Sequence, residues 1–399
     1  MVTQKSQFIL SLLKLGIGTE SVHDSQGTVN DSVKDLLQLS WQKWQEVMAL
    51  AERQGVLAIA VDGLQVLMEA HRGEILAVKE NPEEWQMWLL ENIGQLTQYE
   101  TLNHQQRKVI AELSEMWAAE GIRMMVFKGQ ANAALYPKPE HRAVGDIDCW
   151  LFGDAEKGDD IAKAQGAEVS FEWYRHSKIS FHDETIENHR VMSHTRGNRK
   201  KQEMERELRK LAKPHTDNSF IGKAMRPSAQ FNACFLTYHG LHHFTSEGLR
   251  MKQILDWAMF LQKEQDMVDW DDYWEFCKRY KLERFAAVMN MIATEQLGVV
   301  FHTNSQDLRN ERARLEFTDS TEMEMLAEKV LLSTLYDDDY LFNSGKSDWT
   351  VRWLLVKNML TRNRWKYRDV AQESVLKHMW QSTMGFLIQI VPQKEMKIF

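Results

Sequence analysis

Residues that break regular secondary structure are scarce in this sequence. Glycine accounts for 20 and proline for 6 of the 399 residues, about half of the roughly 12% that is usual for globular proteins. An all-β sandwich or barrel needs a turn about every 8–12 residues, so the composition argues against that class. It favours long helices, because helix interiors contain few glycines and prolines.

The balance of charged residues argues against some classes of protein function. Aspartate and glutamate outnumber lysine and arginine by 57 to 49, which gives a net charge of −8. The chain as a whole therefore lacks the basic excess of a polyanion-binding protein. Hydrophobic residues make up 43% and charged residues 27% of the chain, the balance of a folded globular protein rather than a disordered one.

Cysteine usage and hydropathy predict a cytoplasmic protein. The three cysteines are widely spaced and form no Cys-x-x-Cys motif, so neither a zinc ribbon nor a disulfide framework is expected, and a reducing compartment fits best. The apolar run over residues 8–13 is followed by Lys14 and by no small-residue cleavage site. It favours a short amphipathic helix over a signal peptide. No run of 18 apolar residues occurs, so no membrane span is predicted.

Hydrophobic periodicity divides the chain into four segments. Apolar residues recur at helical spacing through the first 120 residues and again after Pro227, whereas short apolar and alternating runs between them predict strands. We therefore expect an α+β fold with a small α/β core between two helical regions. The predicted segments are a helical N-terminal region (1–120), an α/β core (121–195), a basic connector (196–226) and a helical C-terminal domain (227–399).

The same patterns place the individual elements. Strands are expected over 123–127, 147–152, 168–174, 178–182 and 185–192, with short core helices over 131–135 and 155–164. N-terminal helices are expected over 6–15, 41–51, 57–68 and 83–120. C-terminal helices are expected over 228–245, 249–264, 270–280, 283–296, 320–335, 349–361 and 370–385.

The strongest chemical signal is Gly145-Asp146-Ile147-Asp148, at the start of a predicted strand. Side chains two residues apart on a strand point to the same side, so Asp146 and Asp148 present two adjacent carboxylates. Their repulsion raises the pKa of one of them unless a cation lies between them. Mg²⁺ binds such oxygens and keeps positions for substrate phosphates, as phosphoryl or nucleotidyl transfer requires. The alternative is a solvated acidic pair at the end of a strand.

Groups suited to phosphate lie upstream of this pair. Lys128 and Gly129 separate a predicted strand from a helix that begins near Gln130. Gly129 permits close approach of backbone N–H groups to a ligand, and the positive end of the helix favours an anion. Lys128 would add a mobile cation, and Arg142, four residues before Asp146, would add another. The alternative is an ordinary turn with solvated charges.

A third carboxylate would complete a metal site or act as a base. Glu187 and His189 alternate on one face of the predicted strand 185–192. Two antiparallel strands would bring Glu187 beside the aspartates. The alternative is a polar outer face.

Three histidines form a weaker signal. His239, His242 and His243 share one face of a predicted helix. Together with Asp256 they would hold a metal, as in phosphohydrolases. They would otherwise contact a base or phosphate, or serve in packing.

The segment 196–213 contains eight basic and three acidic residues. It would dock a nucleic-acid acceptor. The commoner explanation of such a pattern is a solvated helix with alternating charges.

The motif set resembles a family of bacterial nucleotidyltransferase-like proteins in the DNA polymerase β-type nucleotidyltransferase superfamily. The family pattern consists of "lKG", "lYp-x-p" and "R-x-x-GDiD". The matching residues are 127–129, 135–139 and 142–148, and further likeness lies in 44–56, in the "vElH" strand at 186–189, and in 239–258. The resemblance covers about residues 35–265.

This resemblance implies a mixed-sheet nucleotidyltransferase core. Asp146 and Asp148 would bind Mg²⁺ or Mn²⁺, and Glu187 would be the third carboxylate, with Asp183 and Glu184 as neighbouring alternatives. The nucleotide-binding residues would be Lys128, Gly129, Arg142 and Gly145, with Lys128-Gly129 in the place of the phosphate-holding Gly-Ser turn of the wider superfamily.

The expected reaction is transfer of a nucleoside monophosphate from an NTP to an acceptor hydroxyl, with release of pyrophosphate. The acceptor would be a small molecule, an RNA end or a protein. One alternative is a catalytically silent nucleotide-binding or protein-interaction module on the same fold. Another is metal-dependent phosphohydrolysis through the three histidines.

Overall fold

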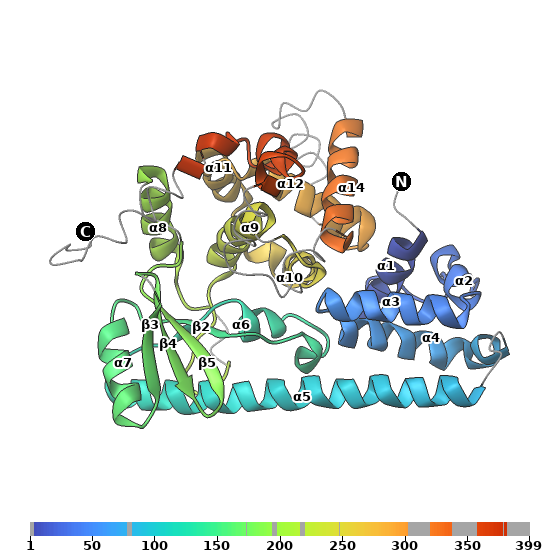
Figure 1. Cartoon of the computed structure of the whole chain (residues 1–399), viewed down its shortest axis with the longest axis horizontal. Helices are drawn as coiled ribbons and strands as arrows, with labels where there is room; N and C mark the ends of the chain where they lie inside the picture. Colours follow the sequence, from blue (N-terminus) through green and yellow to red (C-terminus); the bar gives the residue numbers. More distant parts are fainter. Residues whose placement is uncertain are drawn as a thin grey trace.

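One long helix runs beneath most of the molecule (Figure 1). This helix, α5, spans Pro82–Ala119, close to the range predicted. Glu83 and Glu84 lie in its first turn, where negative charge is favourable. It ends before Gly121, whose φ of 76° is typical of the residue after a helix. The computed structural model describes residues 4–77, 82–172, 174–193, 198–215, 220–246, 248–301, 320–336, 357–377 and 379–380.

Four helices pack beside the first half of α5 (Figure 1). They are α1 (Gln4–Ile17), α2 (Asp31–Leu37), α3 (Trp41–Arg53) and α4 (Leu57–Ala77). The backbones of α1 and α4 touch at two glycines. A Cβ on Gly63 would lie 2.0 Å from the Leu12 carbonyl oxygen, and one on Gly16 would lie 2.1 Å from that of Ile59. Only glycine permits so close an approach.

The helices of the C-terminal half form a layer above the sheet and α6 (Figure 1). They are α8 (Arg199–Leu211), α9 (Ala229–Ser246), α10 (Met251–Glu264), η2 (Gln265–Met267), α11 (Trp270–Tyr280), α12 (Glu283–Met291), η3 (Ile292–Gln296), α14 (Ser320–Tyr336) and η5 (Lys366–Val370). The predicted helices up to 335 are confirmed within a few residues. Residues 349–356 and 381–385 of the last two predictions lie outside the described residues, and 371–374 are not helical.

A five-stranded mixed sheet lies at one end of the molecule (Figure 1). Its strands are β1 (Met125–Val126), β2 (Ile147–Trp150), β3 (Glu168–Glu172), β4 (His176–Phe181) and β5 (Glu184–His189), in the order β1-β2-β5-β4-β3. The short helices α6 (Gly129–Ala133), η1 (Pro139–His141) and α7 (Ala155–Ala164) belong to the same part of the chain. The predicted α+β class, a mixed sheet flanked by helices, is confirmed.

The central pair of strands is parallel. β2 pairs with β5 in parallel, with Asp148 opposite Glu187. The expectation that antiparallel strands bring Glu187 to the aspartates is therefore wrong. The reason is the connection through α7, a crossover that lets β3 run in the same direction as β2. Two antiparallel pairings, β3 with β4 and β4 with β5, then return β5 to that direction.

The two faces of the sheet have different environments. Ile147, Cys149 and Ile186 belong to an apolar core that also contains side chains of α5 and α7. Residues of the predicted N-terminal region and of the predicted α/β core therefore share one packed interior. Asp148 and Glu187 lie on the opposite face, because side chains alternate along a strand.

The other apolar side chains of the helices form a second, larger core. It joins helices from both ends of the described chain, including α1, α4, α9, α10 and α14. Within the described residues, none of the helices combines the length and the apolar character needed to cross a bilayer.

Candidate active site

A cavity of about 610 Å³ lies between the polar face of the sheet and helices α9 and α10. Its volume is within the range of small-molecule sites. All seven predicted site residues line it: Lys128, Gly129, Arg142, Gly145, Asp146, Asp148 and Glu187. The structure therefore brings together residues that lie up to 59 positions apart in the sequence.

The two aspartates have different environments. Asp148 is buried on β2, and its Oδ1 atom lies 2.5 Å from Lys128 Nζ and 2.9 Å from His189 Nε2. Burial alone would raise the pKa of Asp148, but Lys128 and His189 hold it well below its ordinary value. Asp146 is exposed at the cavity edge, and partial desolvation together with Glu187 and Asp148 raises its pKa. The pKa values of the two aspartates are thus shifted in opposite directions, mainly by the partial burial of Asp146 and by Lys128 and His189 beside Asp148.

Glu187 completes the acidic side of the cavity. It lies opposite Asp148 on the parallel strand β5. Burial would raise the pKa of Glu187, but the hydrogen bond from His189 helps to bring it below the ordinary value. Of the two neighbouring alternatives, Glu184 accepts a hydrogen bond from Gln106 at 3.1 Å. Neither Asp183 nor Glu184 is among the residues that line this cavity.

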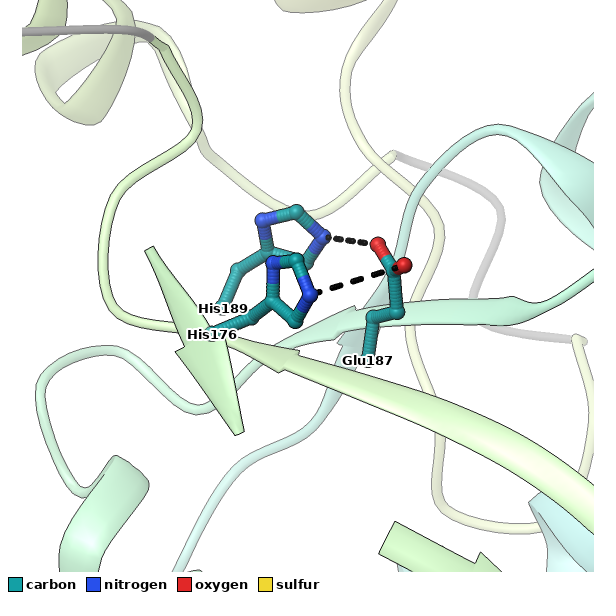
Figure 2. Close-up of side chains that lie close together, drawn as sticks. All are labelled: His176, Glu187 and His189. Carbon is teal, nitrogen blue, oxygen red and sulfur yellow. Dashed lines mark hydrogen bonds and ion pairs between the residues drawn. The ribbon is translucent and has the colours of Figure 1, made fainter. Parts of the chain in front are cut away.

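Two histidines flank Glu187 (Figure 2). His189 Nε2 lies 3.2 Å from one carboxylate oxygen, and His176 Nε2 lies 3.6 Å from the other. Within the described parts of the chain, these three form the one group of potential metal ligands whose donor atoms all lie within 4.8 Å of one another. Asp146, Asp148 and Glu187 line the cavity without reaching that spacing.

The sequence pattern identified His189 but not His176. His176 lies directly opposite His189 on β4. The only local signal for His176 was the alternation of side chains along β4. The pairing of β4 with β5, which brings His176 beside His189, is decided by the tertiary structure. By donor chemistry, the three carboxylates fit Mg²⁺ or Mn²⁺, with His189 hydrogen-bonded to two of them.

Lys128 is not the mobile cation that the sequence suggested. Its φ of 62° is an unusual conformation for a side-chain-bearing residue, of the kind that concentrates at functional sites. Its ammonium lies 2.5 Å from Asp148 Oδ1 and donates toward His239 Nε2 at 3.4 Å. Burial and the nearby Lys128 hold the pKa of His239 well below its ordinary value, so a neutral imidazole accepts this bond.

Arg142 is also not a solvated charge. It is buried, and its Nε and Nη2 atoms donate to Asp256 at 3.1 and 2.7 Å. Asn132 and Tyr136 donate to the same carboxylate at 3.0 and 2.9 Å. Although burial opposes the charged form, Asp256 raises the pKa of Arg142 above its ordinary value. The guanidinium lines the cavity, but it is ion-paired with Asp256.

The loop before the aspartates is anchored to α5. Gln106 donates a hydrogen bond to the Gly145 carbonyl, and Asn103 donates to the Arg142 carbonyl at 3.2 Å. These backbone acceptors lie four residues and one residue before Asp146, so contacts with α5 help to determine where the first carboxylate lies. Nothing in the local sequence pattern of α5 indicated this role.

Three further cations line the same cavity: Arg175, Arg250 and Lys252. Burial, together with the nearby Arg142, lowers the pKa of Lys252 to about 8. These residues follow the β3 strand or begin α10, far from the aspartate motif in the sequence. Sequence reasoning missed them as site residues, although Arg250 lies in the segment that carries the family resemblance.

The three histidines of α9 line the cavity but do not form the metal site considered above. His239 Nε2 lies 3.3 Å from His243 Nε2, and Asp256 faces Arg142 instead. In the part of the chain that the structure describes, these histidines and Asp256 form no group of clustered ligands.

Comparison with known proteins supports the family resemblance. The model of a family described as "Uncharacterised nucleotidyltransferase" matches residues 40–298. That range contains the whole sheet and every residue that lines the cavity. No curated protein and no solved structure matches the sequence.

Proposed function

Because the chain belongs to the family of uncharacterised nucleotidyltransferases, we propose that it transfers a nucleoside monophosphate from an NTP to an acceptor hydroxyl. The acceptor oxygen bonds to the α-phosphorus, the bond from that phosphorus to the β-phosphate bridge breaks, and pyrophosphate leaves. The observation that carries the proposal is a single cavity lined both by the family's carboxylate motif and by a set of cations.

The acidic side of the cavity is suited to a divalent cation. Asp146, Asp148 and Glu187 would hold Mg²⁺ or Mn²⁺, the ions that carboxylates prefer. Such an ion supplies positive charge to the phosphates and orients them for in-line displacement. In this structure Lys128 and His189 compensate the charge of Asp148. We assign Lys128 a second role, contact with a phosphate oxygen of the bound NTP.

The basic side is suited to the triphosphate. Arg175, Arg250 and Lys252 line the same cavity as the carboxylates and add positive charge to it. Gly129 and Gly145 add backbone without a side chain, so a ligand can approach closely.

Arg142 has a different part in the proposal. Its pairing with Asp256 makes it a positioning residue that holds the loop carrying Asp146. This replaces the direct phosphate contact expected from the sequence.

The proton of the acceptor hydroxyl needs an acceptor. Glu187 accepts a hydrogen bond from His189, which helps to keep the pKa of its carboxyl below the ordinary value and the group ionised. It is therefore the group we assign as the general base, and His189 orients it.

The compartment proposed is the cytoplasm. The cysteines Cys149, Cys234 and Cys277 are all buried free thiols, which fits a reducing compartment.

The direct test is to incubate the protein with each α-³²P-NTP, Mg²⁺ or Mn²⁺, and a cell lysate. We expect label in one of three fractions, small molecules, RNA or protein, and release of pyrophosphate, both abolished by a chelator. Metal-dependent NTP binding without any pyrophosphate release would instead indicate the silent module.

The lowered pKa of Lys252 predicts a pH dependence of NTP binding. Its amine is charged below about pH 8 and loses its proton above it, so NTP affinity should fall as the pH rises through about 8. A hydrogen bond to a charged group contributes about 1.5–3 kcal/mol, so Lys252→Met should weaken binding about tenfold or more at pH 7.

Lys252→Arg is the matched control, because arginine stays charged across this range. Isothermal titration calorimetry with a non-hydrolysable NTP analogue between pH 7 and 9 measures the effect. Parallel pH profiles for the wild type and Lys252→Arg would refute the assignment of Lys252 to the phosphates.

A further inference from the structure

A second cavity of about 480 Å³ adjoins the active-site cavity. It lies between α8, α9, the turn from α11 to α12, and residues 371–377. Tyr238 and His242 of α9 line both cavities. Their rings stack with centroids 6.4 Å apart. The two cavities therefore meet at these two side chains.

This second cavity, here called the basic cavity, concentrates positive charge. Its cationic lining residues are Arg199, Lys200, Lys201, Lys281 and Lys377, and its one acidic lining residue is Glu373. Arg199 is compensated by Glu203 at 3.2 Å. Burial lowers the pKa of Lys201, and Glu373 offsets this only in part. The chain as a whole has a net charge of −8. The local excess of positive charge in this cavity therefore favours an anionic ligand.

The backbone around the basic cavity is strained at two places. Lys281 and Gln372 have φ values of 60° and 48°, a conformation that glycine adopts far more readily. Lys281 Nζ donates to the Gln372 carbonyl at 3.4 Å, which links the two strained positions. Strain of this kind concentrates at functional sites. Here the strained backbone carries a lysine at the cavity wall, at a position where an unstrained turn would have glycine or asparagine.

The first turn of α8 connects the basic cavity to the basic segment 196–213. Arg199, Lys200 and Lys201 of this turn line the cavity, and the side chain of Arg199 is also 91% exposed. Part of the charge of this segment therefore lines a hollow as well as a solvated helix face. Arg196 lies outside the described residues.

We propose that the basic cavity binds a phosphate group of the acceptor, so that the acceptor is a phosphate-bearing molecule. This inference rests on the proposed nucleotidyl transfer, which needs a second substrate beside the NTP. The adjoining position lets the acceptor hydroxyl extend past Tyr238 and His242 toward Glu187. A cavity of this volume accommodates a sugar phosphate or the terminal nucleotide of an RNA, which share the phosphate chemistry.

The test uses the full chain and the double variant Lys201→Glu/Lys281→Glu. Binding of a non-hydrolysable NTP analogue with Mg²⁺ is measured first. The analogue is then kept saturating while inorganic phosphate, ribose 5-phosphate, ribose and a short RNA with a free 3′-hydroxyl are titrated separately. We expect the double variant to weaken phosphate binding at least tenfold and to leave analogue binding unchanged.

Two controls accompany this comparison. Lys108→Glu changes an exposed lysine of α5 that lines neither cavity, and it should bind phosphate like the wild type. Lys201→Gln/Lys281→Gln removes the same charges without reversal. It keeps the test valid if the glutamate variant does not fold, and it should also weaken phosphate binding.

The outcomes separate the two proposals. If the wild type binds ribose 5-phosphate more tightly than the RNA, the inference is supported and the source of the phosphate is a sugar phosphate. If it binds the RNA more tightly, with a steep salt dependence, the inference is supported and the source is an RNA. Equal phosphate binding by the wild type and both double variants overturns it, as does wild-type binding of none of the phosphate probes. Failure of the analogue to bind the wild type would contradict the proposed nucleotidyl transfer instead.

Discussion

Replacing Asp148 by Asn is expected to reduce nucleotidyl transfer by about 10³-fold or more. Preorganised charges at the reacting phosphates contribute roughly 10²–10³ each to rate, and Asp148 also carries a share of the cation site. Its carboxylate is buried and compensated by Lys128 and His189, and the neutral amide of asparagine cannot supply the lost charge. The measurement is transfer of label from α-³²P-NTP to the fraction identified with the wild type.

Asp154→Asn is the matched control for this prediction. Asp154 is exposed before α7 and lines neither cavity, so its loss should leave transfer unchanged. Circular dichroism and thermal unfolding show whether Asp148→Asn folds. A folded Asp148→Asn variant that retains more than a tenth of the wild-type activity would refute the carboxylate assignment.

The same substitution has a spectroscopic consequence. Burial opposes the charged form of His189, but the hydrogen bond to Asp148 raises its pKa above the ordinary value. An asparagine at position 148 removes that charge, so the pKa of His189 should fall. NMR titration of the ring measures this independently of any acceptor substrate.

Replacing Asp256 by Leu is expected to lower the free energy of unfolding by about 3–5 kcal/mol, because it leaves a buried guanidinium without its counter-ion. Asp256 accepts four hydrogen bonds, two of them from Arg142. Arg142 belongs to the loop that leads to Asp146, so activity should fall as well. Urea unfolding of the variant and the wild type measures the difference.

The double variant Arg142→Met/Asp256→Leu separates the cost of an unpaired charge from the loss of packing. Replacing both members of a buried ion pair by apolar residues is often neutral, so the double variant should recover most of the lost stability. Asp266→Leu, at an exposed aspartate of η2, should change stability by less than about 0.5 kcal/mol. Equal destabilisation of the single and double variants would contradict the explanation.

Much of the site could be predicted from short-range sequence patterns. The alternation of a strand places Asp146 and Asp148 on one side, whatever the strand's neighbours are. Gly129 and Gly145, two of the nucleotide-binding residues expected from the family resemblance, both line the cavity. The long helix over 83–120 followed from a stretch interrupted only by Gly94, with Gly121 at its end.

The interaction partners of these residues could not be predicted from such patterns. Arg142 seemed to be a phosphate-binding or solvated charge because its counter-ion lies 114 residues further along the chain. Lys128 seemed mobile for the same reason, since no local pattern announces its ion pair with Asp148. The wrong strand direction beside β2 has a comparable cause, because alternation within a strand is the same in parallel and antiparallel pairs.

The sequence by itself therefore determined the helical frame, the strands, the family and seven of the residues that line the active-site cavity. These depend on propensity and on periods of two and 3.6 residues, which act over a few neighbouring positions. Only the tertiary structure decided the parallel pairing of Asp148 with Glu187, the commitment of Arg142 to Asp256, and the basic cavity beside α9. Those features depend on which distant segments are buried together, and burial determines whether a charge is solvated, paired or available to a ligand.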